Sequence, residues 1–416
     1  MNTTPFDENM IKREVLERFL RYVRVGTTSD RKSDETPSTP GQWDLARMLE
    51  QELAALGLTD IELDEHCYLI ARLPATPGYE ASPVIGLMAH VDTASDVTGE
   101  NVKPQVIEHY NGAAVAVGEY TLDPREFPAL LDYVGDTIVT TDGTTLLGGD
   151  DKAGIAEIMT AVHWLVDHPD VPHGEVEIIF TPDEETGRGM DRFPKEKLKS
   201  RACYTFDGGA EGRIEAECFN AWRCVVSFTG SVIHLGDARG KLVNAVSMAA
   251  SYITMIPRSE SPEATDGYFG YYCPLEIRGN LEQAELDVYL RDHDRTQIER
   301  RIEALSAFAA AVEAAFPGGA VSVKSEKQYL NMYETIQKDP LVMDKLREAM
   351  TEAGYTPLMH AIRGGTDGSR LTEMGIPTPN LSAGEFNMHS RLEWVPVGAL
   401  ARVTDVALKL VQAWAR

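Results

Sequence analysis

The stretch Pro83-Val-Ile-Gly-Leu-Met-Ala-His-Val-Asp92 is central to predicting the fold. Its first seven residues are nearly all apolar, as expected of a strand that is buried on both faces of a sheet. Further strands are predicted at Val176–Phe180 and Cys203–Phe206, and a periodic helix at Ala153–Val166 precedes them. Strands that alternate with helices predict an α/β layer architecture, in which ligands bind at the carboxyl ends of the strands.

The middle of the chain follows a different pattern. Its predicted order is β-α-β-β-α-β, from Trp222–Thr229, Val243–Ile256, Tyr272–Arg278, Ala284–Arg291, Arg295–Phe316 and Ala320–Lys327. This order is typical of a ferredoxin-like domain. The predicted fold class is therefore α/β, with a central mixed sheet flanked by helices in residues 1–218 and 330–416, and with an inserted ferredoxin-like domain in residues 219–329.

The remaining segments are assigned by periodicity and by turn residues. Four more helices are predicted, around residues 15–23 and 45–56 and at Leu341–Ala353 and Pro396–Trp414. Residues 94–140 are predicted to form an irregular insertion with hairpin character. Residues 363–384 are rich in Gly and Pro and are predicted to be mostly loop.

Composition excludes several kinds of partner. The 416 residues contain 39 Lys and Arg against 65 Asp and Glu, which gives a net charge of −26. Such a chain should repel nucleic acids and anionic membranes, whose phosphates require basic residues. No segment is long and apolar enough for a membrane helix. The stretch Met1–Arg13 lacks the apolar core of a signal peptide. The five cysteines form no CxxC pair. A cytoplasmic protein with reduced thiols is expected.

Acidic residues and histidines cluster at the predicted strand ends and helix starts. His90-Val-Asp92 follows the first buried strand, and Gly148-Gly-Asp150-Asp151 leads into the helix. Residues i and i+2 of extended chain face the same way, so Asp92 is placed to orient the imidazole of His90. Each motif alone also fits a simpler explanation, a surface turn for the first and a helix cap for the second.

Three more motifs carry metal-ligating side chains. Thr181-Pro-Asp-Glu184-Glu185-Thr-Gly187 and Asp207-Gly-Gly209 each follow a predicted strand, and Glu385-Phe-Asn-Met-His389 lies in a later loop. Adjacent glutamates point in different directions, so one can ligate a metal while the other serves as a base. A solvated acidic turn and an ordinary surface histidine are the simpler alternatives.

Taken together, these motifs favour a paired-metal site. His90, Asp150, Glu185, Asp207 and His389 are five nitrogen or oxygen ligands of the kind that zinc accepts. A site with two metals and one bridging carboxylate needs about this inventory, and Glu184 remains free as a base.

The same residues support a family resemblance over nearly the whole chain. The chain resembles the peptidase T branch of the cocatalytic-zinc peptidases and amidohydrolases, a group that also includes glutamate carboxypeptidase, dipeptidases and aminoacylase. The matching stretches are residues 37–43, 90–93, 140–143, 150–160, 181–185, 207–209 and 363–368. His-x-Asp and Asp-Asp-Lys belong to the wider group, whereas Thr-Pro-Asp-Glu-Glu and the long insertion after His90 point to the peptidase T branch.

The resemblance implies a role for each site residue. Asp150 would bridge two zinc ions, with His90 and Asp207 completing one site and Glu185 and His389 the other. Glu184 would be the general base, and Asp92 would support His90.

In the inserted domain, which the resemblance identifies as a lid, His234 would stabilise the oxyanion. Asn244, Arg291 and Arg363 would contact the peptide substrate. The chain departs from the family in reading His234-Leu235-Gly236 where His-Pro-Gly is usual, in carrying Asp237 nearby, and in having Ser390 after the last histidine.

The expected activity is zinc-dependent removal of the N-terminal residue from tripeptides in the cytoplasm. Two Zn²⁺ ions are expected, with Co²⁺ or Mn²⁺ as substitutes, because nitrogen and oxygen ligands select weakly among these metals. Small peptides are the expected partners, and the sheet edge of the lid could pair two copies into a homodimer. Another amidohydrolase of the same group (a dipeptidase, carboxypeptidase or deacylase) and a non-catalytic binding protein are the alternatives.

Overall fold

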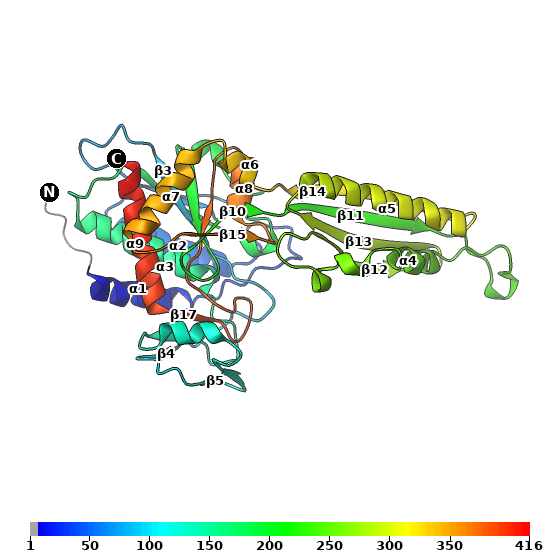
Figure 1. Ribbon diagram of the computed structural model, residues 1–416, viewed down its shortest axis with the longest axis horizontal. Coiled ribbons are helices and arrows are strands. Elements are labelled where there is room, and N and C mark those ends of the chain that lie inside the picture. The colour runs from blue at the N-terminus through cyan, green and yellow to red at the C-terminus, as the bar shows by residue number, and fades with distance from the viewer. Residues whose placement is uncertain (1–6) are drawn as a thin grey trace. The chain divides into compact units, whose positions relative to one another are not determined.

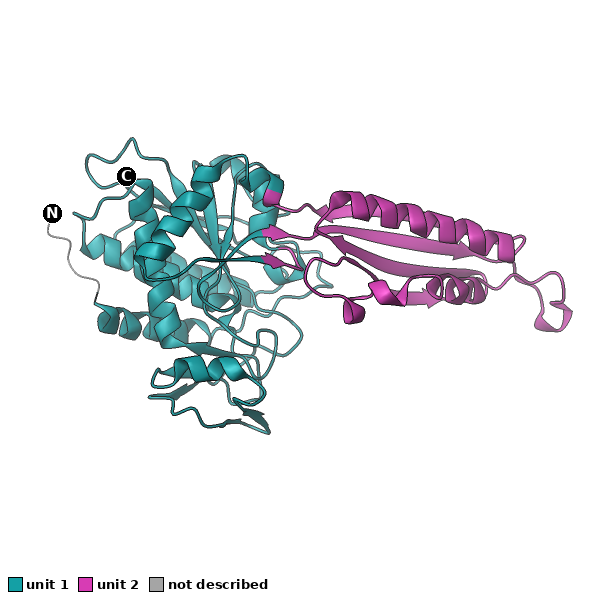
Figure 2. Ribbon diagram, in the orientation of Figure 1, with its two compact units in different colours: residues 1–216, 334–360, 366–416 teal, residues 217–333, 361–365 magenta. Residues whose placement is uncertain are grey.

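The computed structural model describes residues 7–416, so the first six residues of the polar stretch Met1–Arg13 lie outside the described part. Tertiary contacts divide the chain into two compact units (Figure 2). Unit 1 comprises Met1–Ala216, Glu334–His360 and Thr366–Arg416, and unit 2 comprises Glu217–Tyr333 and Ala361–Gly365. The sequence-based boundaries of 219 and 329 differ in detail, and the sequence assigned residues 361–365 to the larger domain.

An eight-stranded mixed sheet forms the centre of unit 1, in the order β1-β2-β8-β3-β9-β16-β10-β15 (Figure 1). Its strands are β1 Asp60–Leu63, β2 Leu69–Leu73, β3 Ile85–His90, β8 Val176–Thr181, β9 Ala202–Phe206, β10 Arg213–Cys218, β15 Leu358–Ile362 and β16 Asn380–Leu381. Strand β3 runs parallel to both β8 and β9, and every residue of these three strands is buried. The prediction of a strand buried on both faces is confirmed.

Helices pack against this sheet and against one another. They are α1 Glu8–Tyr22, α2 Gly41–Ala55, α3 Gly149–Asp167, α7 Pro340–Glu352, α8 Asp367–Glu373 and α9 Val397–Trp414, with the short α6 Tyr333–Ile336 at the unit boundary. Helix α3 packs on β3 and β9 and is covered by α1 and α9, so nearly all its side chains are buried. Helix α2 packs on β1 and β2. No helix between residues 7 and 416 is long and apolar enough to cross a membrane.

The insertion between β3 and α3 forms two small sheets. Strands β4 Gln105–Ile107, β7 Ile138–Thr140 and β17 Trp394–Pro396 pair in the order β17-β7-β4, and β5 Val115–Val117 pairs with β6 Tyr120–Leu122 as a hairpin. The predicted hairpin character is therefore present. The insertion is held by its own apolar cluster, which includes Tyr110, Leu130 and Trp394.

Unit 2 has the predicted β-α-β-β-α-β order. Its elements are β11 Asn220–Thr229, α4 Ala245–Ile253, β12 Tyr271–Gly279, β13 Gln283–Asp292, α5 Arg295–Ala315 and β14 Ala320–Tyr329. The four strands pair antiparallel in the order β12-β13-β11-β14, the arrangement of a ferredoxin-like sheet, and both helices contribute to one apolar cluster with it. The predicted fold class is confirmed.

Strand β8 lies between β2 and β3, so its packing should govern the stability of unit 1. Ile179 is fully buried there beside Tyr68 and Met88. We expect Ile179→Ala to lower the free energy of unfolding by about 2–5 kcal/mol, because it leaves a cavity. Leu131→Ala, at a side chain that is 53% exposed in the same unit, should change it by less than about 0.5 kcal/mol. Urea unfolding followed by tryptophan fluorescence measures both, and equal effects would contradict the assignment of the core.

Candidate metal centre

The three parallel strands deliver the predicted site residues to one edge of the sheet. His90 is the last residue of β3, Glu184 and Glu185 lie in the 3-10 turn Glu184–Thr186 after β8, and Asp207 directly follows β9. Asp150 comes from the start of α3, and His389 from the loop between β16 and β17. The structure thus brings together all five side chains that the sequence singled out as metal ligands.

Asp150 lies at the centre of this group and faces both histidines. Its Oδ1 is 2.9 Å from Nε2 of His90, which in turn lies 3.9 Å from Oδ1 of Asp207. Its Oδ2 is 3.2 Å from Nε2 of His389, which lies 2.9 Å from Oε1 of Glu185. Each oxygen of Asp150 therefore belongs to a different histidine–carboxylate pair, an arrangement that suits a carboxylate bridging two cations.

The donor set fits divalent cations. Ligand atoms of His90, Asp150 and Glu185 lie within 4.8 Å of one another, as do those of His90, Asp151 and Asp207. The buried Oε1 of Glu185 lies 2.9 Å from Nε2 of His389. Imidazole nitrogen and carboxylate oxygen atoms that converge in this way are ligands of the kind that zinc binds.

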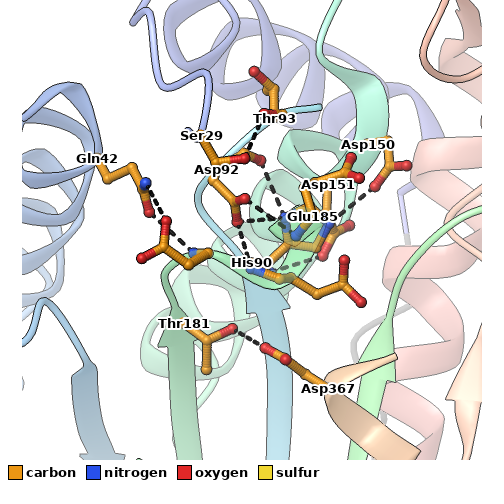
Figure 3. Close-up of polar contacts among 12 residues, drawn as sticks. Ser29, Gln42, His90, Asp92, Thr93, Asp150, Asp151, Thr181, Glu185 and Asp367 are labelled. Atoms are coloured by element: carbon orange, nitrogen blue, oxygen red, sulfur yellow. Dashed lines mark hydrogen bonds and ion pairs between the residues drawn. The ribbon is translucent and has the colours of Figure 1, made fainter. Parts of the chain in front are cut away.

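Asp92 contacts both His90 and the glutamate turn beside this group (Figure 3). Its Oδ1 lies 3.2 Å from Nδ1 of His90. The two carboxylate oxygens also accept hydrogen bonds from the backbone N–H groups of Glu184 and Glu185, at 3.0 and 3.2 Å. One buried carboxylate therefore fixes both the imidazole and the glutamate turn.

Glu393 is a supporting residue that the sequence analysis missed. Its buried carboxylate accepts hydrogen bonds from the backbone N–H groups of Leu147, Gly148 and Asp150, at 2.7, 2.8 and 3.1 Å. It thereby fixes the loop that presents Asp150. No local pattern could reveal this, because the partners lie more than 240 residues apart in the chain.

Two more buried acids position the glutamate turn. Asp183, at a left-handed φ of 58°, accepts hydrogen bonds from the Ser38 backbone and from the Gln42 side chain, both at 2.8 Å. Asp367 accepts one from the hydroxyl of Thr181 at 2.6 Å (Figure 3). Both acids belong to stretches that carried the family resemblance, but neither was assigned a role.

The pKa values of the site reflect its crowding. Burial and then the charge of Asp150 raise the pKa values of Glu185 and Asp207, and burial raises that of Glu184. Hydrogen bonds to Asp150 and Glu185 raise the pKa of His389 to about 11. His389 therefore holds a proton at neutral pH that it would have to lose to bind a cation.

The residues that were predicted to bind the substrate belong to unit 2. His234 is exposed, and its Nδ1 accepts a hydrogen bond from the backbone N–H of Gly236 at 3.2 Å. Asn244 caps α4, where its side-chain oxygen accepts hydrogen bonds from Val246 and Ser247 at 2.9 and 3.3 Å. The structure thus gives Asn244 a structural role at the helix start.

Arg291 and Arg363 both lie against aromatic rings of unit 2. The guanidinium of Arg291 lies 4.9 Å from the centre of the Tyr289 ring, and that of Arg363 lies 5.5 Å from the centre of the Tyr271 ring. Arg363 donates to backbone oxygens at 3.1 and 2.9 Å and to a Thr hydroxyl at 2.8 Å, whereas Arg291 donates to backbone oxygens at 3.3 and 2.9 Å. Neither forms a salt bridge with a carboxylate among residues 7–416.

Comparison with known proteins identifies the protein family to which the chain belongs. The profile of Peptidase family M20/M25/M40 matches residues 142–413, well over half of the chain. The chain belongs to this family of peptidases and is therefore a hydrolase.

Full-length relatives in this family are peptidases T. The chain is 45% identical over 405 residues to peptidase T of Geobacillus thermodenitrificans, which covers 97% of this chain and 98% of the relative. It is 42% identical over 405 residues to peptidase T of Listeria monocytogenes, with the same coverage. The resemblance to the peptidase T branch is confirmed.

Solved structures share the fold. Aminopeptidase PepT from Bacillus cereus superposes with a TM-score of 0.75 at 22% identity, covering 97% of this chain and 99% of that one. A tripeptidase from Staphylococcus aureus gives 0.76 at 22% identity with the same coverage. A Bacillus subtilis protein described as a dinuclear metal binding peptidase of the M20 family gives 0.65 at 14% identity, covering 97% and 98%.

Cation binding to this centre should release protons. His389 has a pKa of about 11 and must lose a proton to become a ligand, and the raised pKa values of Glu185 and Asp207 act in the same direction. We expect the affinity for Zn²⁺ to rise with pH between about pH 5 and 8. Calorimetric titration of metal-stripped protein in buffers of different ionisation enthalpy measures the protons released, and a pH-independent affinity would contradict the prediction.

Proposed function

We propose that the protein removes the N-terminal residue from tripeptides with the help of two divalent cations, Zn²⁺ being the first candidate and Co²⁺ or Mn²⁺ the substitutes. The observation that carries this proposal is the position of Asp150, whose two oxygens face two separate histidine–carboxylate pairs. The peptidase T relatives and the structurally similar tripeptidase support the choice of substrate. A cytoplasmic location and pairing of two copies stay predictions of the sequence.

The residues of the centre divide into ligands and a base. His90 and Asp207 would hold one cation, Glu185 and His389 the other, and Asp150 both. Bound dications polarise a carbonyl group and lower the pKa of a water molecule toward neutrality. Asp92 fixes the backbone of Glu184, whose carboxylate would accept a proton from the attacking water and return it to the leaving amine.

Unit 2 would supply the groups that recognise the peptide. His234 is exposed and is proposed to donate a hydrogen bond to the developing oxyanion, an interaction typically worth about 2.7–4 kcal/mol. Arg291 and Arg363 are suited to the C-terminal carboxylate of a short peptide, because a guanidinium group binds a carboxylate through two parallel hydrogen bonds.

The role of Glu184 is tested by Glu184→Gln. We expect a loss of turnover of about 10²–10⁴-fold with unchanged metal content, because the amide cannot accept the proton. Glu185→Gln is the matched control and should instead weaken metal binding. Steady-state kinetics and elemental analysis of the same preparations measure both effects. Full activity of metal-loaded Glu184→Gln protein would exclude this glutamate as the base.

The substrate class is tested with a peptide panel on metal-stripped and zinc-restored protein. Tripeptides with a free α-amine should be cleaved faster than dipeptides, tetrapeptides and N-acetylated tripeptides, and only after metal is restored. Chromatographic detection of the released residue identifies the bond that is cut. Equal cleavage of the N-acetylated peptide would favour a deacylase or carboxypeptidase instead.

A further inference from the structure

A further acidic side chain, Glu385, lies beside the proposed metal ligands without having been assigned a role. It precedes His389 by four residues in the same loop and is fully buried. Its Oε1 accepts a hydrogen bond from the backbone N–H of Gly208 at 2.8 Å. Its Oε2 is buried and has no hydrogen-bond partner among the described residues.

The carboxylate of Glu385 lies close to two of the proposed metal ligands. Oxygen atoms of Asp150, Asp207 and Glu385 lie within 4.8 Å of one another. A side chain at Gly149 would block this approach, because a Cβ atom there would lie 2.9 Å from Oε2 of Glu385. The loop that presents Asp150 is therefore shaped to admit the glutamate.

The hydrogen bond from Gly208 accounts for only one of the two carboxylate oxygens of Glu385. That bond ties the loop before His389 to the loop after Asp207, and it uses only Oε1. An amide oxygen would serve equally well there and would not add a negative charge beside Asp150 and Asp207. A buried carboxylate oxygen without a donor is costly, and a cation is the partner that would offset the cost.

We propose that Oε2 of Glu385 is a further ligand for the cation held by His90, Asp150 and Asp207. This inference rests on the proposed metal centre. A third carboxylate on that cation makes the site richer in oxygen, and oxygen ligands suit Mn²⁺ better than Zn²⁺ relative to imidazole. Glu385 thus biases this half of the centre toward a harder cation.

The test compares metal affinities of Glu385→Gln and the unaltered chain. The substitution keeps the size of the side chain and an oxygen for the Gly208 N–H. After metal removal, the affinity for Mn²⁺ should fall about 10–100-fold in the variant, and that for Zn²⁺ should fall less. Calorimetric titration with each metal alone measures this, and the visible spectrum of the Co²⁺-loaded protein should change as one ligand is lost. Equal affinities and an unchanged Co²⁺ spectrum would overturn the proposal.

Glu157→Gln is the matched control. Glu157 is fully buried in α3, and neither of its carboxylate oxygens has a hydrogen-bond partner among the described residues, yet it belongs to none of the ligand groups. Its substitution removes a buried acid nearby and should leave both metal affinities unchanged. A fall in Mn²⁺ affinity equal to that of Glu385→Gln would assign the effect to general electrostatics and would overturn the ligand role.

A measurement on the unaltered chain covers the case in which Glu385→Gln does not fold. Crystals soaked in Mn²⁺ should show, by anomalous scattering, a cation bonded to Oε2 of Glu385. A cation bonded to Asp207 but not to Glu385 would overturn the proposal while leaving the metal centre intact. Binding of two cations without peptide hydrolysis would instead contradict the proposed function and leave the role of Glu385 standing.

Discussion

Repulsion between buried carboxylates at one edge of a parallel sheet is the constraint on which this structure depends. Strands β8, β3 and β9 are adjacent and parallel, so the acids that follow them are forced together. Burial raises the pKa values of Glu184, Glu185 and Asp207 because no medium of high dielectric screens their charges. Such an arrangement is retained only if other groups hold the acids in place against their repulsion.

Backbone N–H groups provide much of this restraint. Asp92, Asp183 and Glu393 each accept at least one backbone N–H from a segment distant in the chain, and each is almost fully buried. These hydrogen bonds fix the glutamate turn and the loop of Asp150 relative to the strands. Acidic side chains thus hold the site loops in place and also supply the proposed ligands. A count of 65 acidic residues in the composition could not reveal this division of roles.

The sequence predicted the elements whose signals are local. Apolar runs and helical spacing located β3, β8, β9 and α3 to within a few residues, although α3 begins at Gly149 rather than Ala153. Strand β15 was missed because it is mostly exposed, β16 because it is two residues long, and α8 because it lies in a Gly-rich stretch. The ligand set was predictable because each acid stands next to a strong strand or helix signal, whereas Glu393 and Glu385 act through partners far away in sequence.

Two arginines of unit 2 have no acidic partner among the described residues. Arg291 and Arg363 donate to neutral backbone and hydroxyl oxygens, so no carboxylate among the described residues pairs with either guanidinium. Both guanidinium groups lie against aromatic rings, in a chain whose net charge is −26. An arginine kept free of acids can still form its strongest interaction, which is with a carboxylate. Because a short peptide ends in a carboxylate, this arrangement supports the substrate class proposed from the metal centre.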